Sequence, residues 1–172
     1  MFEREAVRQP EAEIRARSGM PELLAICEAV KQRTETGKIV LRSEESAFKQ
    51  GKQAYVKGLL HPTDTDTALD GWLVFIQEIR SHSGRHRHQG GLAIYVLEGR
   101  GYTTVDGQRV DWEEGDLILL PVKPNGVEHQ HFNLDPEKPS RWLALIPYHL
   151  WAYAGNCITQ VELSPDWREM DD

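Results

Sequence analysis

The sequence predicts an all-β domain, folded as a sandwich or a closed barrel, with a helical extension at its N-terminus. From Ile39 onward, short apolar runs alternate with Gly, Pro, Asp and Asn, which is typical of short strands joined by tight turns. The pair Asp106-Gly107 separates two β-rich runs, and a two-residue hairpin favours residues that tolerate positive φ. No second helical pattern as long as the N-terminal one follows, so the body of the chain is expected to be mostly strand.

Composition indicates one globular domain without a nucleic-acid or membrane partner. With 172 residues, 40% of them hydrophobic, the chain has enough apolar side chains for one core. Its 20 basic and 27 acidic residues give a formal net charge of -7, which repels a phosphate backbone. Residues 1–30 contain no apolar stretch like a signal peptide, and no later run approaches the length of a membrane span. We therefore expect a cytoplasmic protein.

The two cysteines, Cys27 and Cys157, are far apart and outside any C-x-x-C pattern. They therefore indicate neither a disulfide framework nor a thiolate zinc site. Both are expected to be reduced and partly buried.

A helical arm is predicted before the strands. Pro21 is suited to a helix start, apolar residues follow at three- and four-residue spacing as far as Val30, and Gly37 is suited to a helix stop. The chain is accordingly divided into a helical arm at 1–38 and a barrel at 39–172.

Strands are predicted where apolar and β-branched residues recur between turn signals. The clearest segments are 72–80, 92–97, 102–105, 109–112, 116–120, 127–133 and 141–146, and weaker ones are 54–60 and 158–163.

Four of the seven histidines form two close pairs, His86-Arg87-His88 and His129-Gln130-His131. Residues two apart in a strand point to the same face, so each pair can direct both imidazoles into one interior. Neutral imidazole suits Fe(II), Mn(II), Ni(II), Zn(II) and Cu(II) alike. A single His-x-His on a surface strand is often only solvated, so the pairing of two such motifs carries the metal hypothesis.

Two stretches resemble the paired sequence motifs of the cupins. Residues 86–101 resemble the first motif, with H-x-H followed by a strand that ends in Val-Leu-Glu-Gly. Residues 115–133 resemble the second, with Gly115, Pro121, a Pro-Asn-Gly turn and then His129, although residues 122–124 are an insertion. The resemblance implies a double-stranded β-helix, which is a jelly-roll barrel with a metal near its open end.

By the same resemblance, His86, His88 and His129 would be the metal ligands. The first cupin motif usually supplies a glutamate ligand as well, and its position here is taken by Leu92. Three ligands with open coordination positions are a common catalytic arrangement. We therefore expect the metal to be retained, with Leu92 facing the metal cavity.

A narrower resemblance links the chain to the gentisate-type ring-cleaving dioxygenases. It rests on H-R-H, an apolar residue at the glutamate position, E-G-R-G at the end of a strand, and H-x-H-x-N in the second motif. It implies three histidines that hold Fe(II), with a small aromatic or enolisable chelating acid and O2 as substrates. Mn, Ni or Zn remains open, and this chain is about half the length of the two-cupin enzymes of that family.

Beside the ligands, His131 is expected to point inward as a catalytic residue that orients substrate or oxygen or moves protons, with a purely structural hydrogen bond as the alternative. Arg80 and Arg87 are considered as partners for a substrate carboxylate, although Arg87 alternates outward. An amphipathic helix and five tryptophans suggest a homodimer. Two further functions stay open: a lyase, isomerase or hydrolase with a Lewis-acid metal, and a cupin that only binds a small molecule.

Overall fold

The computed structural model describes residues 19–89, 91–155 and 158–169, and it confirms the all-β jelly roll. The elements are α2 (Met20–Thr36), the 3-10 turn η1 (Ser43–Glu45), β1 (Lys49–Gln50), β2 (Tyr55–Leu60), β3 (Trp72–Ile79), β4 (Arg85–His88), β5 (Leu92–Glu98), β6 (Arg100–Val105), β7 (Gln108–Glu113), β8 (Leu117–Leu120), β9 (Val127–Asn133), β10 (Ser140–Pro147), α3 (Tyr148–Tyr153) and β11 (Thr159–Glu162).

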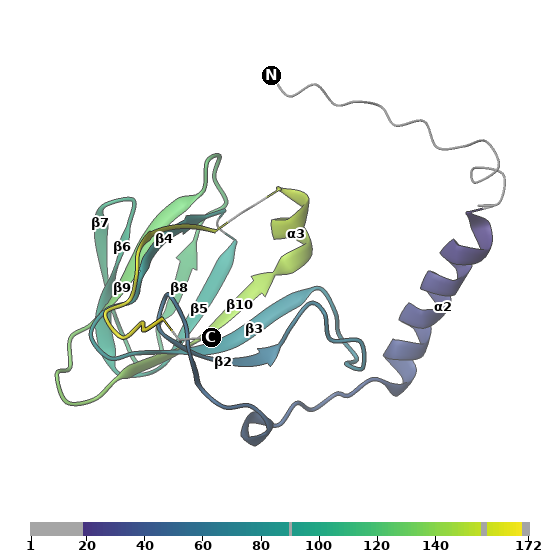
Figure 1. Cartoon of the computed structure of the whole chain (residues 1–172), viewed down its shortest axis with the longest axis horizontal. Coiled ribbons are helices and arrows are strands. Elements are labelled where there is room, and N and C mark those ends of the chain that lie inside the picture. The colour runs from purple at the N-terminus through teal and green to yellow at the C-terminus, as the bar shows by residue number, and fades with distance from the viewer. Residues whose placement is uncertain (1–18, 90, 156–157, 170–172) are drawn as a thin grey trace.

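The strands form two antiparallel sheets that face each other (Figure 1). One sheet has the order β1-β2-β3-β10-β5-β8 and the other the order β11-β4-β9-β6-β7. Many neighbouring strands come from distant parts of the chain, as when β10 pairs with both β3 and β5. This interleaving is what a jelly roll requires.

The predicted hairpin at Asp106-Gly107 joins β6 to β7. Both residues have positive φ, 48° and 83°, which is the conformation of a type I′ turn. The turn fixes the pairing of Val105 with Gln108, and through it the register of the whole β6–β7 pair. A local sequence signal therefore positions β7 beside β6, the strand that pairs with β9.

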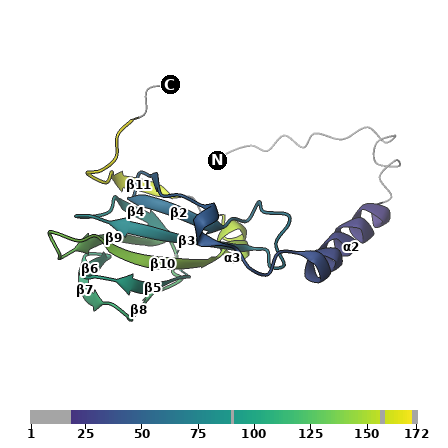
Figure 2. The same cartoon turned by 90° about the horizontal axis from the view of Figure 1, so that it is seen from below.

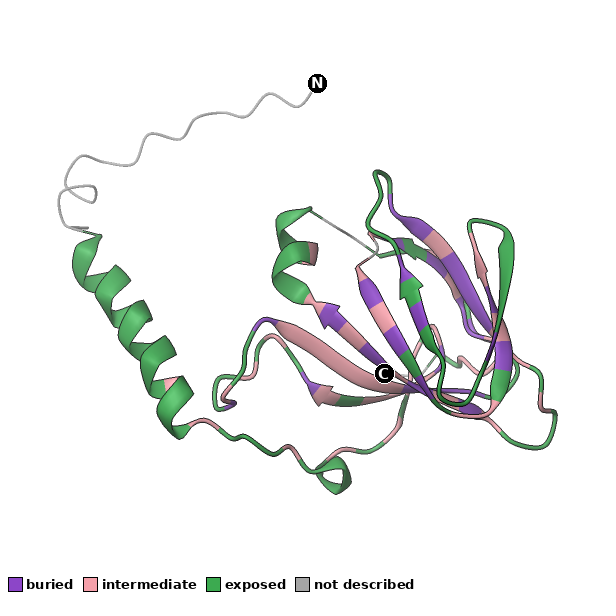
Figure 3. Ribbon diagram, turned by 180° about the vertical axis from the view of Figure 1, so that it is seen from behind, coloured by how far each residue is buried: buried purple, intermediate pink, exposed green. Residues whose placement is uncertain are grey.

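The core lies between the two sheets (Figure 3). Along β5 and β10 buried residues alternate with more exposed ones, so Ile94, Val96, Trp142 and Ala144 point inward. The outer face of the six-stranded sheet is apolar too. Strand register aligns two rows of side chains across β3, β10, β5 and β8: Ile76, Leu143, Tyr95 and Leu117 in one, and Val74, Leu145, Ala93 and Leu119 in the other.

Helix α2 stands apart from the sheets in both views (Figure 1, Figure 2). Its predicted limits are confirmed, with a proline in the first turn and Gly37 as the C-cap. None of its residues is buried, and Cys27 is exposed, so the expectation that Cys27 is partly buried is wrong. Cys157 lies outside the described residues. No described helix is both long enough and apolar enough to cross a membrane.

Candidate metal centre

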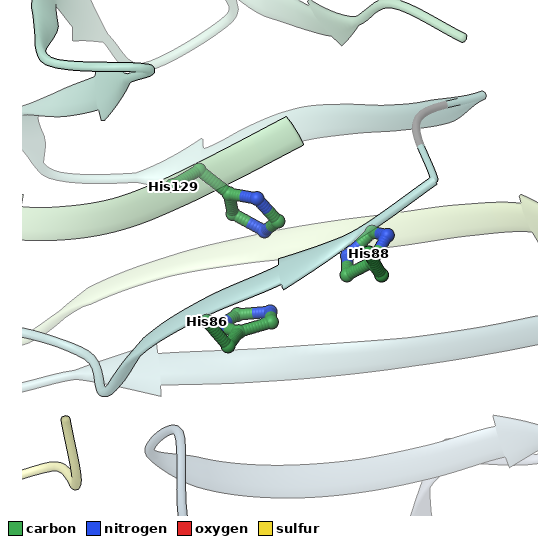
Figure 4. A group of neighbouring side chains, drawn as sticks. All are labelled: His86, His88 and His129. Carbon is green, nitrogen blue, oxygen red and sulfur yellow. The ribbon is translucent and has the colours of Figure 1, made fainter. Parts of the chain in front are cut away.

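Strand register brings three histidines together. In the antiparallel pair of β4 and β9, His86 lies directly opposite His129. His88 lies two residues further along β4, on the same face. The imidazole nitrogens that the three side chains offer all lie within 4.8 Å of one another (Figure 4). The three residues are buried, each with less than a tenth of its surface exposed.

Hydrogen bonds made by the Nδ1 atoms fix which nitrogen of each histidine ring carries the proton. The Nδ1 atom of His86 lies 3.3 Å from the Gly84 carbonyl oxygen, and that of His129 lies 3.2 Å from the Val127 carbonyl oxygen. In His88, Nδ1 lies 2.6 Å from the carbonyl oxygen of the next residue. A carbonyl can only accept, so each Nδ1 must donate, and the lone pair is left on Nε2. All three rings thus present a lone pair.

The electrostatic environment keeps these rings neutral. Burial lowers the pKa of His86 to about 4, helped by the nearby charge of His88. Burial also lowers the pKa of His88, against a smaller opposing effect of its backbone hydrogen bond. For His129, burial and then repulsion from the other histidines hold the pKa well below its usual range. A metal competes with a proton for each lone pair, so neutral rings favour metal binding at ordinary pH.

His131 is buried as predicted and lies beside this cluster, but it is not one of the three grouped nitrogen donors. Its ring centroid lies 5.5 Å from that of His129 and 4.8 Å from that of Trp142. Its Nδ1 atom lies 2.7 Å from the Thr103 hydroxyl. Burial, followed by repulsion from His86 and His88, lowers the pKa of His131 to about 3. The neutral ring therefore suits hydrogen bonding better than proton transfer near pH 7.

The four histidines line a cavity of about 270 Å³ between the sheets. Leu92 is buried and lines this cavity, as predicted for the residue at the glutamate position. The remaining walls are mostly apolar: Val56, Leu73, Phe75, Trp142, Ile146, Trp151 and Ile158. Among the described lining residues there is no Lys, Arg, Asp or Glu. The cavity is small for a ligand site, and its polar side chains are histidines and the glutamines Gln53 and Gln77.

One buried polar side chain on the cavity wall was not singled out by the sequence analysis. Gln77 on β3 is 3% exposed, and its Nε2 has no hydrogen-bond partner among the described residues. It lies directly opposite Trp142 on β10, and the indole nitrogen of Trp142 is likewise buried without a described partner. A lone glutamine within the apolar run of β3 was the signal that could have identified it.

Other candidates lie away from the cavity. Arg87 points outward and pairs with Glu128 at 2.9 Å, as its position between two inward residues predicts. Arg80 pairs with Glu78 at 3.2 Å and does not line the cavity. The expectation that Asn133 is structural is confirmed, because its amide donates to the carbonyl oxygens of Asp135 and Lys138 in the β9–β10 turn and to that of Arg80 just after β3.

Comparison with known proteins agrees with this fold. The family model described as "Cupin domain" matches residues 72–146. A gentisate 1,2-dioxygenase from Ralstonia sp is 39% identical over 69 residues, which are 40% of this chain and 18% of that protein. The chain therefore spans less than a fifth of the length of this curated relative.

Solved structures share the fold at low sequence identity. A polyketide cyclase from Streptomyces resistomycificus superimposes with a TM-score of 0.55 at 19% identity, covering 75% of this chain and 89% of that one. A salicylate 1,2-dioxygenase from Pseudoaminobacter salicylatoxidans, in complex with gentisate, gives 0.52 at 21% identity, covering 86% of this chain and 39% of that one. The two sheets, the paired histidine motifs and these matches identify residues 72–146 as a cupin domain that resembles part of the gentisate dioxygenases.

Proposed function

We propose that His86, His88 and His129 hold one divalent metal ion, Fe(II) in the native protein, and that the protein is a dioxygenase. The observation that carries this proposal is the set of three buried, neutral imidazoles that share one tautomer and face one cavity. Such a donor set fits a first-row transition metal. Mn, Ni or Zn fits the same donors, so the identity of the bound metal has to be measured.

The charge of the site supports a chelating anionic substrate. Three imidazoles leave the double positive charge of the ion uncompensated, and Leu92 supplies no carboxylate. Three ligands leave positions open for a bidentate substrate and for O2. Iron(II) at this position would supply Lewis acidity and the electrons for dioxygen chemistry. The apolar walls exclude bulk water and strengthen the attraction between the site and the bound anion.

The lining residues narrow the class of substrate. Since no Lys or Arg is among the described residues around the cavity, a carboxylate that did not reach the metal would be buried without a cation. We propose that the charge of the substrate lies on its chelating oxygens, as in a catecholate, an enolate or a phenolate with an adjacent carbonyl or carboxylate. The aromatic rings of Phe75, Trp142 and Trp151 are suited to a flat substrate of this kind.

Metal analysis followed by oxygen uptake tests the proposal. Protein purified without added metal should contain close to one equivalent of iron, or should take it up anaerobically. The Fe(II) protein should then consume O2 with one or more hydroxybenzoates, catechols or β-diketones, and the Zn(II) protein should stay inert with the same compounds. Iron-loaded protein that consumes no O2 with any of these compounds would contradict the dioxygenase proposal.

A metal-dependent lyase, isomerase or hydrolase is the second candidate. The observation that favours it is the same set of three imidazoles, because three histidines also form a known catalytic zinc site in which the metal acts only as a Lewis acid. Turnover by the Zn(II) protein without oxygen would support this function. Tight ligand binding without any turnover would instead support a cupin that only binds a small molecule.

The homodimer stays a prediction, supported by the outer face of the six-stranded sheet. Tyr95, Leu117 and Leu119 are more than a third exposed there and form continuous rows with apolar neighbours on β10 and β3. Contiguous apolar surface of this kind is uncommon on a monomer. We propose that a second copy of the chain covers this face.

A further inference from the structure

His131 differs from the three proposed ligands in what lies behind its ring. The other three face backbone carbonyl oxygens with Nδ1, whereas His131 faces the hydroxyl of Thr103 at 2.7 Å. Register explains the contact, because Thr103 on β6 lies directly opposite His131 on β9. Both side chains are buried, with exposures of 0% and 1%. A hydroxyl can donate or accept a hydrogen bond. The direction of the bond between Thr103 and His131 therefore depends on the second hydrogen-bond partner of the Thr103 hydroxyl.

That partner is Trp112 on β7. Its indole Nε1 donates to the Thr103 hydroxyl at 2.9 Å. An indole N–H has no acceptor capacity, so Thr103 must accept this bond with one lone pair. The proton of the hydroxyl then has one acceptor among the described residues, the Nδ1 atom of His131. A buried hydroxyl that left its proton unpaired would lose the free energy of a hydrogen bond.

The position of Trp112 is itself set by a glycine. Gly101 lies directly opposite Trp112 in the β6–β7 pair, two residues from Thr103. A Cβ at position 101 would lie 2.5 Å from two atoms of the indole ring, closer than any ordinary contact. The missing side chain lets the ring lie against β6, where its nitrogen reaches Thr103. Gly101 is the second glycine of the E-G-R-G run noted in the sequence.

We infer that Trp112 and Thr103 fix His131 in the tautomer opposite to that of His86, His88 and His129, so that His131 presents an N–H donor to the cavity where they present lone pairs. Thr103 is thus a positioning residue, and His131 donates a hydrogen bond to an oxygen of the bound substrate instead of binding the metal. The tautomer is independent of the proposed function. The contact with substrate rests on the proposed function, and the two are tested separately.

The tautomers can be read directly by nitrogen NMR on the diamagnetic Zn(II) protein labelled with ¹⁵N-histidine. Long-range proton–nitrogen correlations distinguish a protonated Nε2 from a protonated Nδ1. In the unmodified protein, His131 should show a protonated Nε2, and the three proposed ligands should show a protonated Nδ1. A protonated Nδ1 on His131 would overturn the inference without any variant being made.

Two substitutions at position 103 separate positioning from packing. Thr103→Val keeps the shape of the side chain and removes the hydroxyl, so His131 should lose its single tautomer, whereas Thr103→Ser should restore it. Zinc content should be unchanged in both variants, because His131 is not a ligand. Loss of zinc in Thr103→Val with retained zinc in Thr103→Ser would mean that His131 binds the metal, and it would overturn the inference.

Ligand affinity tests the contact with substrate. Catechol binding to the Zn(II) protein can be followed by quenching of the tryptophans that line the cavity. Loss of one oriented donor should weaken binding by about tenfold in Thr103→Val and little in Thr103→Ser. Equal affinity in all three proteins would overturn the contact. If the unmodified Zn(II) protein binds no catechol, the proposed function fails for this substrate class, and the tautomer measurement still stands.

Discussion

The metal-free protein should lose stability steeply on mild acidification. Its histidine cluster is buried and neutral, and burial holds the pKa of His86 at about 4 and that of His131 at about 3. Unfolding exposes both rings to water, where the pKa returns to about 6.5. Because the folded-state values are the lower ones, the stabilisation is complete above pH 6.5 and is lost as the pH falls toward 4.

The size of this loss follows from the two pKa differences. At pH 5 the unfolded chain binds nearly one proton more at each ring than the folded protein does. Relative to pH 8, linkage gives about 2 kcal/mol for His86 and about 2 kcal/mol for His131. The combined loss of about 4 kcal/mol is large against the total of about 5 to 15 kcal/mol that folded domains possess. The metal-free protein should therefore be only marginally stable near pH 5.

Urea unfolding of the protein, kept metal-free with a chelator, at several pH values between 5 and 8 measures this loss. His131→Phe should remove about 2 kcal/mol of this pH dependence, and the other buried histidines should account for what remains. Bound metal should delay the loss, because it occupies the same lone pairs that protons would take. A free energy of unfolding that is constant from pH 8 to pH 5 would refute the reasoning.

Four substitutions test the remaining expectations. His129→Ala should reduce metal content to background, whereas the outward-facing Arg87→Ala should keep it; near-normal metal in the first would contradict the ligand assignment. Leu92→Glu should tighten Zn(II) binding at least tenfold by adding a carboxylate ligand and should slow oxygen uptake, while unchanged affinity would mean that the side chain does not reach the metal. Gln77→Leu should raise the free energy of unfolding of the metal-free protein by about 1 to 2 kcal/mol, because it removes an unpaired buried amide; a destabilised variant would mean that the amide is paired. Leu119→Glu should convert a dimer to a monomer by light scattering, and an unmodified protein that is monomeric at micromolar concentration would contradict the dimer.

The fold was predictable because its signals are local. Alternating apolar residues identified most strands within one or two positions, and segment 127–133 agrees with β9 at both ends. Parity along a strand was enough to predict that His86 and His88 share a face. By contrast, α3 spans only six residues and shows too little periodicity to be recognised. The division into an arm at 1–38 and a barrel at 39–172 stays a prediction, because the described part begins at residue 19.

The residues around the ligands were harder to predict because they depend on pairing between distant strands. Thr103 lies in the run Arg100–Val105, which is polar enough that one more hydroxyl attracts no notice. Its role depends on lying opposite His131, and that register is a property of the assembled sheet. Gln77 was more accessible to sequence reasoning, since it is polar in an apolar strand. Nothing in the sequence, however, indicated that the Gln77 amide would lack a hydrogen-bond partner.

The arrangement behind His131 also bears on how such motifs are read and designed. Four histidines point inward and lie close together. The groups that hydrogen-bond to their Nδ1 atoms decide how many of them can act as ligands. Behind His131 these groups are Thr103 and Trp112, which lie on strands that supply no ligand. A Thr103→Asp substitution would place an acceptor behind His131, draw the proton to Nδ1 and free a fourth lone pair. In such proteins, the number of histidines in a motif is therefore an upper limit on the number of histidine ligands.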